Sequence, residues 1–547
     1  MAKVGQYGST RSAGGDEAVP PARLRNAVML RAKPWRVIPV VLAATALGTL
    51  LATARYGIGL TPDSVVYVAG ARSFANGHGY TRAGAAITDF PPGYSAVLSL
   101  AERSGIDAID AARVLSVAAF EVTVLLAYVL LSRHVRSSGI RLGATVVVGC
   151  SAVLLDVYEK ALSEHLFLPV LLGFALVIER LAERPRSASL LAGAASLVWA
   201  AFYLRYIGVV FAAVGAIVVF AAEWRRSRVF AVVRGTTFGA VAVSVPVLWM
   251  VRNVDAGSDP FGHRASASVS VFTNVSRIAK QTATWLFTDV GPGAVRLVLL
   301  IAALFVVGVL AVRMRRDGAG LPGDWRSMYP LTLLVVVYVV YLAGSASVVA
   351  FGAISNTRFM VPVFVPMIVI GAWMFEHVRR RVHGEDVRRA ITVMAGAWVA
   401  LNVVWFAARA VHSAQNGAGG YASAHYHNSQ ILKDVKKLDP SLPTFSNDAP
   451  AVGLFDGRDV RPSVARTYFQ SDDQTGKLGD FVRFVGCHAR VELIWFLPNP
   501  RPYMYTPAQL SRAVRLHVAV KRADGVIYDV RPRQPVVPGS NLQCAHA

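Results

Sequence analysis

The sequence predicts a mainly α protein: a polytopic bundle of about eleven transmembrane helices, followed by a C-terminal extracytoplasmic α/β domain. Three observations lead to this prediction. Hydrophobic residues make up 54% of the 547-residue chain and charged residues only 16%, whereas soluble domains carry about a quarter charged residues. Apolar runs long enough to span a bilayer recur along the chain. After about residue 412 the composition becomes polar.

The distribution of positive charge favours a membrane protein over a nucleic-acid-binding one. The formal net charge is +23, but Lys and Arg form short clusters between apolar runs rather than one stripe. Such clusters are typical of cytoplasmic loops, and no nucleic-acid partner is expected. Residues 1–35 are mostly Gly, Ala, Ser, Arg and Pro around further charged residues. We expect them to form a disordered cytoplasmic tail, too long and too polar to be a cleaved signal peptide.

A spanning helix needs about 20 mostly apolar residues. Eleven segments approach this length, although the fifth and sixth are short and nearly continuous. They are 36–54, 108–131, 142–158, 165–181, 187–203, 206–222, 229–251, 294–313, 327–350, 358–377 and 390–411. Together they define a transmembrane module over residues 36–411.

The charged connections predict the orientation of this module. If the N-terminus is cytoplasmic, the inside connections are "SRHVRSSGIR", "ERLAERPR", "EWRRSR", "RMRRDGAGLPGDWR" and "RRRVHGEDVRR". All five are rich in Arg, as the positive-inside rule requires. We therefore expect a multi-pass plasma (inner) membrane protein whose connections 55–107, 157–164 and 253–293 face outward, as does everything after about residue 412.

The C-terminal segment, 412–547, has the features of a small soluble domain. "PTFSN", "RVELIWFL" and "GVIYDV" are predicted as strands, and "TPAQLSRAVRLHV" as a helix with a Thr cap and Pro at its first position. Cys487 and Cys544 both lie in this segment, and an oxidising compartment would permit a disulfide between them. Two separate thiols are the alternative. Cys150 lies alone in a span and is expected to serve packing.

Asp63 lies at the start of the first outward connection. The stretch Thr61–Asp63 has the pattern of a helix start, with a capping hydroxyl, a Pro in the first turn and an acid near the positive end of the helix dipole. Asp63 and Tyr67 then share one helix face. Two interpretations remain open: an acid that stabilises a short interfacial helix, or a general base held at the membrane surface.

Other candidate residues lie on the same side of the membrane. Asp89 precedes "FPPGY" and has the pattern of a turn acid, and Tyr67 and Tyr94 have the pattern of interfacial aromatics. Glu164 and His165 lie in "EKALSEHLFL", between the third and fourth spans. Ionisable residues at membrane depth are usually paired or functional. A metal site at Glu164 and His165 is an alternative, weakened because adjacent helix residues point in different directions.

Four arginines are expected on the outward side, where the positive-inside rule disfavours them. They are Arg205 in "YLRYIG", Arg252 in "WMVRN", Arg264 in "DPFGHR" and Arg358 in "SNTRFMVPVFVP". One interpretation is that they reach the lipid headgroups or pair with nearby acids. The other is a phosphate site, because a guanidinium binds phosphate in bidentate fashion.

Taken in order, these motifs resemble the GT-C superfamily of integral-membrane glycosyltransferases. The resemblance is to the bacterial group related to protein O-mannosyltransferases and lipid A aminoarabinose transferases. It covers most of the chain, through "DSVVYVAGARSFANGHGY", "FPPGYSAVL", "LSEHLF", "LRYIG", "WMVRN", "TRFMVPVF" and "FSNDAPAVGLFDGR". The sequence departs from the best-known members because Ser64, rather than a second acid, follows Asp63. This leaves Asp63 as the sole candidate there.

The resemblance implies a transferase that moves a sugar from a polyprenyl-phosphate donor to an extracytoplasmic acceptor hydroxyl, with inversion. In this scheme Asp63 is the catalytic base, and Arg205 and Arg358 bind the donor phosphate, with Arg252 and Arg264 in reserve. Asp89, Glu164, Tyr67, Tyr94 and His165 orient the acceptor or support the site. No cofactor is expected, and a divalent metal is left open without support. The alternative function is a transporter or flippase, but internal repeats and mid-membrane charges, which are typical of transporters, are not evident.

Overall fold

Helices dominate the structure, a computed structural model that describes residues 34–533 apart from 83, 263, 265, 268, 288–324, 350–356, 383, 459, 468–473 and 500. The helices of the first half are α1 (Pro34–Ala52), α2 (Pro62–Ala75), α3 (Gly93–Arg103), α4 (Ala108–His134), α5 (Ser138–Gly149), α6 (Ala152–Tyr158), α7 (Glu164–Glu183), α8 (Ala188–Leu204), the 3-10 turn η1 (Tyr206–Val209), α9 (Val210–Trp224) and α10 (Arg228–Asp255). They are followed by α11 (Val271–Phe287), α13 (Trp325–Val348), α14 (Thr357–Arg381) and α15 (Glu385–Asn416).

Eight helical segments of the described chain are long and apolar enough to cross a membrane, judged by length and composition. They are Ala108–His134, Ser138–Tyr158, Glu164–Glu183, Tyr206–Trp224, Arg228–Asp255, Ser327–Val348, Arg358–Arg381 and Glu385–Asn416. Two shorter apolar helices, Arg36–Ala52 and Ala188–Leu204, coincide with the predicted spans 36–54 and 187–203. The predicted span 294–313 and most of the predicted tail lie outside the described residues, so the count of eleven stays a prediction.

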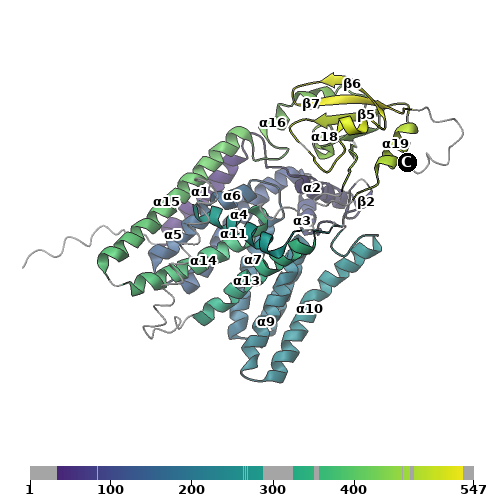
Figure 1. The fold of residues 1–547 in the computed structure, drawn as a ribbon. Helices are drawn as coiled ribbons and strands as arrows, with labels where there is room; N and C mark the ends of the chain where they lie inside the picture. Colours follow the sequence, from purple (N-terminus) through teal and green to yellow (C-terminus); the bar gives the residue numbers. More distant parts are fainter. Residues whose placement is uncertain are drawn as a thin grey trace, which may run out of the picture.

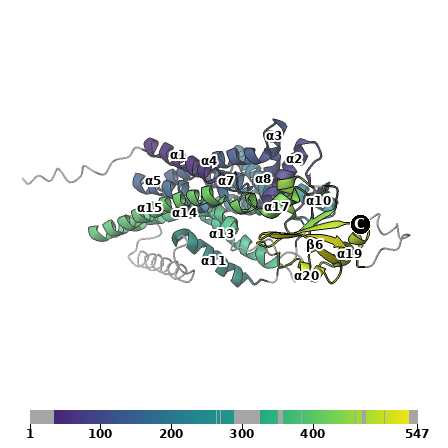
Figure 2. The ribbon, with the colours of Figure 1, turned by 90° about the horizontal axis from the view of Figure 1, so that it is seen from above.

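The connections predicted to face outward contain structure of their own. The connection 55–107 holds α2, α3 and a two-stranded hairpin of β1 (Thr81–Arg82) and β2 (Ala85–Ala86). The connection 253–293, for which no helix was predicted, contains the amphipathic helix α11, which packs against α13 and α14. Seen from above, α2, α3 and α10 lie at the same end of the molecule as the C-terminal strands (Figure 2).

The C-terminal α/β domain is built on a five-stranded sheet of order β4-β3-β5-β7-β6. β3 (Thr444–Ser446) pairs in parallel with β4 (Arg461–Pro462) and β5 (Val491–Phe496), whereas β7 (Gly525–Arg531) is antiparallel to β5 and to β6 (Arg515–Lys521). The domain's helices are α16 (Ala424–His427), α17 (Gln430–Val435), α18 (Ala449–Asp456), α19 (Leu478–Gly486) and α20 (Pro507–Leu510). Figure 1 shows this domain at one end of the helical bundle, opposite the far end of the α9–α10 hairpin.

Sequence predictions for this domain were correct for the strands and wrong for one helix. The three predicted strands are β3, β5 and β7. The predicted helix "TPAQLSRAVRLHV" is only the four-residue α20, which has the expected Thr506 cap and first-turn Pro507. The end of the predicted helix, from Arg515 onward, lies in the strand β6. Tertiary pairing with β7 overrides the helical pattern there. The predicted partner of Cys487, Cys544, lies outside the described residues, so the disulfide stays a prediction.

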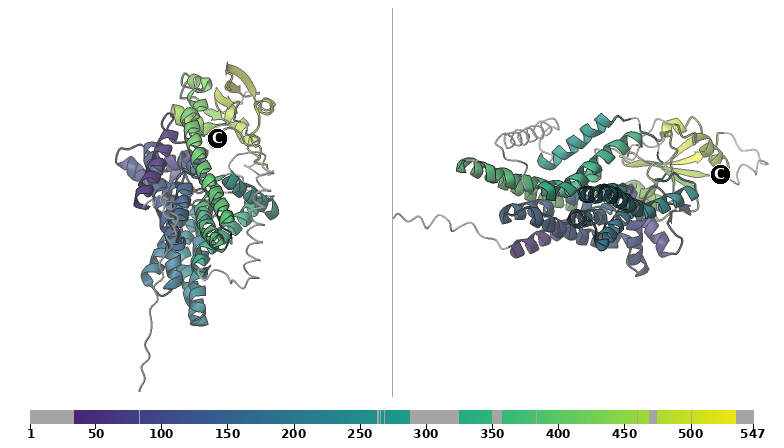
Figure 3. Two further views of the ribbon diagram at one scale, coloured as in Figure 1. Left: turned by 90° about the vertical axis from the view of Figure 1, so that its left-hand side faces the viewer. Right: turned by 90° about the horizontal axis from the view of Figure 1, so that it is seen from below.

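The C-terminal domain is hydrogen-bonded to the bundle beside the start of α2. Gly59 pairs with the α6–α7 turn, since its N–H donates to the carbonyl of Glu159 at 2.7 Å and its carbonyl accepts from Ala161 at 2.8 Å. Leu60 accepts from the N–H of Tyr421 at 2.7 Å, just after the long helix α15 ends. Figure 3 shows α15 running along the bundle to this domain. Gly420 has a φ of +59°, and a Cβ there would lie 2.0 Å from the Leu60 carbonyl oxygen, so the contact requires glycine.

Candidate active site

Helix α2 holds Asp63 in a rigid first turn. Thr61 and Ser64 form a capping box, in which each side chain accepts a hydrogen bond from the backbone N–H of the other, at 3.2 and 3.0 Å. Pro62 occupies the first helical position. The predicted helix start is therefore confirmed, and it places a carboxylate at the positive end of the helix dipole. The catalytic role of Asp63 stays a prediction.

Asp63 forms an ion pair with Arg358, which lies in the first turn of α14. A guanidinium nitrogen of Arg358 lies 2.5 Å from the Oδ2 atom of Asp63, and the two side chains are 19% and 21% exposed. The guanidinium also lies over the ring of Phe359, 5.0 Å from its centroid. The pair therefore joins α2 and α14, which are far apart in the sequence, and both side chains are partly exposed to solvent.

A second ion pair, Glu164–Arg205, is more deeply buried. Glu164 begins α7 and is fully buried, whereas Arg205 is 13% exposed in the extended residue between α8 and η1. The bend at Arg205 depends on close packing at Gly208, because a Cβ there would lie 2.3 Å from the backbone of α8. The sequence motif "LRYIG" thus describes a turn that points an arginine at the start of α7.

Tyr67 lies between the two ion pairs. Its hydroxyl hydrogen-bonds to the hydroxyl of Ser163 at 3.1 Å, next to Glu164. Burial raises the pKa of Tyr67 well above its ordinary value, the negative charges of Asp63 and Glu164 raise it further, and Arg205 opposes them. Asp63, Glu164 and Arg205 therefore all act on one buried hydroxyl, which keeps its proton.

Tyr94 and His165 are buried side chains that contact each other next to Tyr67. The Tyr94 hydroxyl lies 3.4 Å from Nδ1 of His165, and Nε2 of His165 lies 3.3 Å from the carbonyl oxygen of Val157. The ring of Tyr158 stacks on His165 with centroids 5.3 Å apart. Both imidazole nitrogens are thus close to protein groups. Among the described residues, no group of three or more His, Cys, Asp or Glu side chains is arranged to hold a metal ion.

Arg252 and Arg264 donate hydrogen bonds to backbone carbonyls in the described structure. Arg252 donates to the carbonyl of Ile87 at 2.8 Å, and Arg264 donates to the backbone carbonyl of Asp89 at 2.7 Å. Arg252, near the end of α10, and Arg264, just after it, therefore both bind backbone carbonyls of the short segment that holds Ile87 and Asp89. In the described part of the chain neither forms an ion pair with Asp63 or Glu164. The structure brings together Asp63, Glu164, Arg205, Arg358, Tyr67, Tyr94 and His165. Asp89, Arg252 and Arg264 lie beside this group, since Phe90, next to Asp89, packs against Tyr67 with ring centroids 5.3 Å apart.

Sequence reasoning missed Arg409, which ties α15 to the α6–α7 turn. Arg409 pairs with Asp156 and with Glu159, which is fully buried. The available signal was the same one that identified the other four arginines, because Arg409 also lies at the end of a span predicted to face outward. The network fixes the turn that carries Ser163 and Glu164 into the candidate site.

A buried carboxylate of the C-terminal domain, Asp448, was also missed. It accepts hydrogen bonds from Tyr421 at 2.8 Å and from Tyr426 and Asn499 at 2.5 Å each, and Arg501 lies 3.4 Å away. The motif "FSNDAPAVGLFDGR" contains Asp448, but its partners come from the segment after α15 and from the segment after β5, so the motif alone did not single it out. The network stabilises the junction described above.

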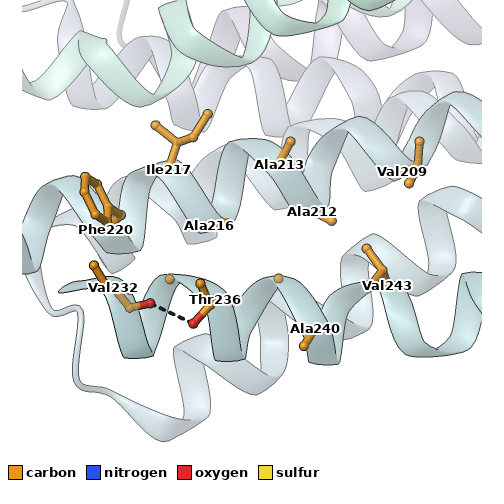
Figure 4. Close-up of a pocket in the computed structure, with 12 residues that line it drawn as sticks. Val209, Ala212, Ala213, Ala216, Ile217, Phe220, Val232, Thr236, Ala240 and Val243 are labelled. Atoms are coloured by element: carbon orange, nitrogen blue, oxygen red, sulfur yellow. Dashed lines mark hydrogen bonds between the residues drawn. The ribbon is translucent and has the colours of Figure 1, made fainter. Parts of the chain in front are cut away.

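One cavity of the described structure is lined without any of these charges. It has a volume of about 610 Å³ and lies between α9 and α10 (Figure 4). Small apolar side chains such as Ala212, Ala216 and Val243 line it, and the hydroxyl of Thr236 is bonded to its own helix. Without a titratable group, this groove is unsuited to proton transfer. A smaller cavity of about 230 Å³ lies between α2 and α18.

Comparisons with known proteins found a similar fold among solved structures. No protein-family model matches the sequence, and no curated protein matches it. The chain resembles the crystal structures of ArnT from Cupriavidus metallidurans, in the apo state and bound to undecaprenyl phosphate, each with a TM-score of 0.54 and 12% identity. The apo match covers 91% of this chain and 98% of ArnT, and the bound match 90% and 97%. At this identity the likeness concerns the fold alone, and it extends over most of both chains.

Proposed function

We propose that the protein is a membrane glycosyltransferase that moves a sugar from a polyprenyl-phosphate donor to an acceptor hydroxyl outside the cytoplasm. The observation that carries this proposal is the pairing of two carboxylates with two arginines at the ends of α2, α7, α8 and α14. Such a site offers a proton acceptor beside cations that suit a phosphate. The GT-C fold shared with ArnT, which has been crystallised with undecaprenyl phosphate, supports a lipid-linked donor.

In the proposed reaction, Asp63 takes the proton of the acceptor hydroxyl as its oxygen attacks the anomeric carbon of the sugar. The bond from that carbon to the phosphate oxygen breaks on the opposite face, with inversion. The phosphate leaves as an anion, so no general acid is required. Arg358 and Arg205 stabilise the negative charge that develops on it. Glu164 acts as a positioning residue because it fixes Arg205, and Tyr67 links the two pairs through Ser163.

The proposed reaction takes place on the outer side of the membrane. With the N-terminus cytoplasmic, as the Arg-rich connections predict, the ion pairs and the C-terminal domain face the outer side of the plasma membrane. A lipid-linked sugar delivered to the outer leaflet would meet an envelope glycan, lipid or protein acceptor there. We propose no metal or cofactor for the reaction.

The test uses the full chain, purified and reconstituted in lipid, with a panel of polyprenyl-phosphate sugars and an envelope extract as acceptor. Release of free polyprenyl phosphate from one donor, lost in Asp63→Asn, is the expected result and would identify the sugar. Glu102→Gln is the matched control, because Glu102 pairs with Arg72, which is 46% exposed. Full activity of Asp63→Asn would rule out the base. No release from any donor would favour the transport alternative.

A further inference from the structure

Asp63, the proposed base, forms an ion pair with Arg358, which is proposed to bind the donor phosphate. Arg358 lies 2.5 Å from Oδ2 of Asp63. A carboxylate oxygen that already accepts hydrogen bonds from a guanidinium is less available to an incoming hydroxyl. A guanidinium that donates to a carboxylate also has fewer donors to offer a phosphate. In the structure described here, each of the two groups therefore weakens the proposed role of the other.

The two ion pairs of the site differ in how easily they can be exchanged. Glu164 is fully buried against Arg205, so separating them would leave a buried charge without its partner. Asp63 and Arg358 are each about one-fifth exposed, as their 21% and 19% values indicate. Asp63 also lies in the first turn of α2, where the helix dipole stabilises its charge without Arg358. The Asp63–Arg358 pair is therefore the one that a ligand can open.

We propose that Asp63 and the donor phosphate compete for Arg358, so that binding of the donor phosphate releases Asp63 to act on the acceptor. This inference rests on the proposed function and adds an order to it. The phosphate replaces the carboxylate on the guanidinium, and the freed carboxylate becomes the hydrogen-bond acceptor for the incoming hydroxyl. By thermodynamic linkage, donor binding then increases acceptor affinity, and acceptor binding increases donor affinity.

Competition predicts an effect on binding that does not depend on turnover. Undecaprenyl phosphate would be titrated against the full chain in lipid nanodiscs. Asp63→Asn removes the competitor, and we expect it to bind about two- to fivefold more tightly than the wild type, as for a partly exposed ion pair. Arg358→Gln should bind much more weakly. The double variant should bind like Arg358→Gln, because without the guanidinium there is nothing to compete for.

Two further variants separate competition from simple charge repulsion. Asp63→Glu keeps the charge and should bind like the wild type, whereas Asp63→Ser provides a second neutral variant that tolerates a helix start, in case Asp63→Asn folds poorly. Glu102→Gln removes an acid that pairs with Arg72 instead and should leave affinity unchanged. A gain for Asp63→Asn that persists in the Arg358→Gln background would overturn the inference in favour of repulsion.

The failure of this inference differs from the failure of the proposed function. Equal affinity in the wild type and the neutral Asp63 variants would overturn the competition while leaving the transferase proposal standing. If undecaprenyl phosphate binds neither the wild type nor any variant, the phosphate role of Arg358 is wrong, and both proposals fail together.

Discussion

Replacing Glu164 with Gln tests whether the buried ion pair holds the candidate site together. The side chain of Glu164 is fully buried and that of Arg205 is 13% exposed. Removing one partner of such a pair leaves a buried charge uncompensated, which costs about 3–5 kcal/mol. The amide oxygen of Gln can still accept one hydrogen bond from Arg205. We therefore expect Glu164→Gln to lower the free energy of unfolding by about 3 kcal/mol, the lower end of that range.

The loss can be measured by reversible unfolding of the full chain in mixed micelles, together with Arg205→Met and the double variant. The double variant should lose clearly less than the sum of the single losses, because neither charge is then left without its partner. Glu102→Gln is the control; its partner Arg72 is 46% exposed, so a loss of under about 1 kcal/mol is expected. Losses for Glu164→Gln no larger than for the control, or additive losses with Arg205→Met, would refute this reasoning.

Three further predictions concern the surroundings of the site. Gly208→Ala should reduce transfer activity at least tenfold while the chain stays folded in thermal-shift assays. The added Cβ would lie 2.3 Å from the α8 backbone and would displace the turn that holds Arg205. Unchanged activity would contradict the role of that turn. Asp448→Asn should speed trypsin cleavage of the C-terminal domain, since it removes a fully buried carboxylate, and a cleavage rate equal to that of the wild type would contradict this. Hydrogen bonding, led by Arg522 at 2.6 Å, lowers the pKa of Asp434 from 3.8 to about 2. The stabilisation is therefore complete above pH 3.8 and is lost as the pH falls through about 2. The stability advantage of the wild type over Arg522→Gln, followed by fluorescence, should vanish over that window, and an advantage that persists below it would contradict the assignment.

The sequence predicted the local structure around the candidate site well, because short-range rules govern it. The start of α2 follows from Thr61 and Pro62, and the bend at Arg205 follows from the break between two apolar runs. The β3, β5 and β7 strands follow from apolar residues between turn residues. In each case the residues that determine the element lie within a few positions of it.

Ion pairs and strand pairings between distant segments could not be predicted from these short-range rules. The acids and arginines of the site were identified from the sequence. Nothing in the sequence assigned Arg358 to Asp63 or Arg205 to Glu164, or showed that Arg252 and Arg264 bind backbone carbonyls instead. Arg409 was overlooked although it obeys the same rule. The strand β6 was assigned to a helix because its pairing with β7 is a tertiary interaction.

The hydrogen bonds at Gly59 and Leu60 have a consequence for biosynthesis. These residues leave the ribosome early, together with the base candidate, yet Leu60 is bonded to Tyr421, which is made only after the last described span. The segment that leads into α2 therefore cannot reach its final pairing until the bundle has been inserted and the C-terminal domain has begun to emerge. A chain that is truncated before Tyr421 would lack the hydrogen bond to Leu60 at the entrance to α2, so full assembly comes late and depends on complete translation.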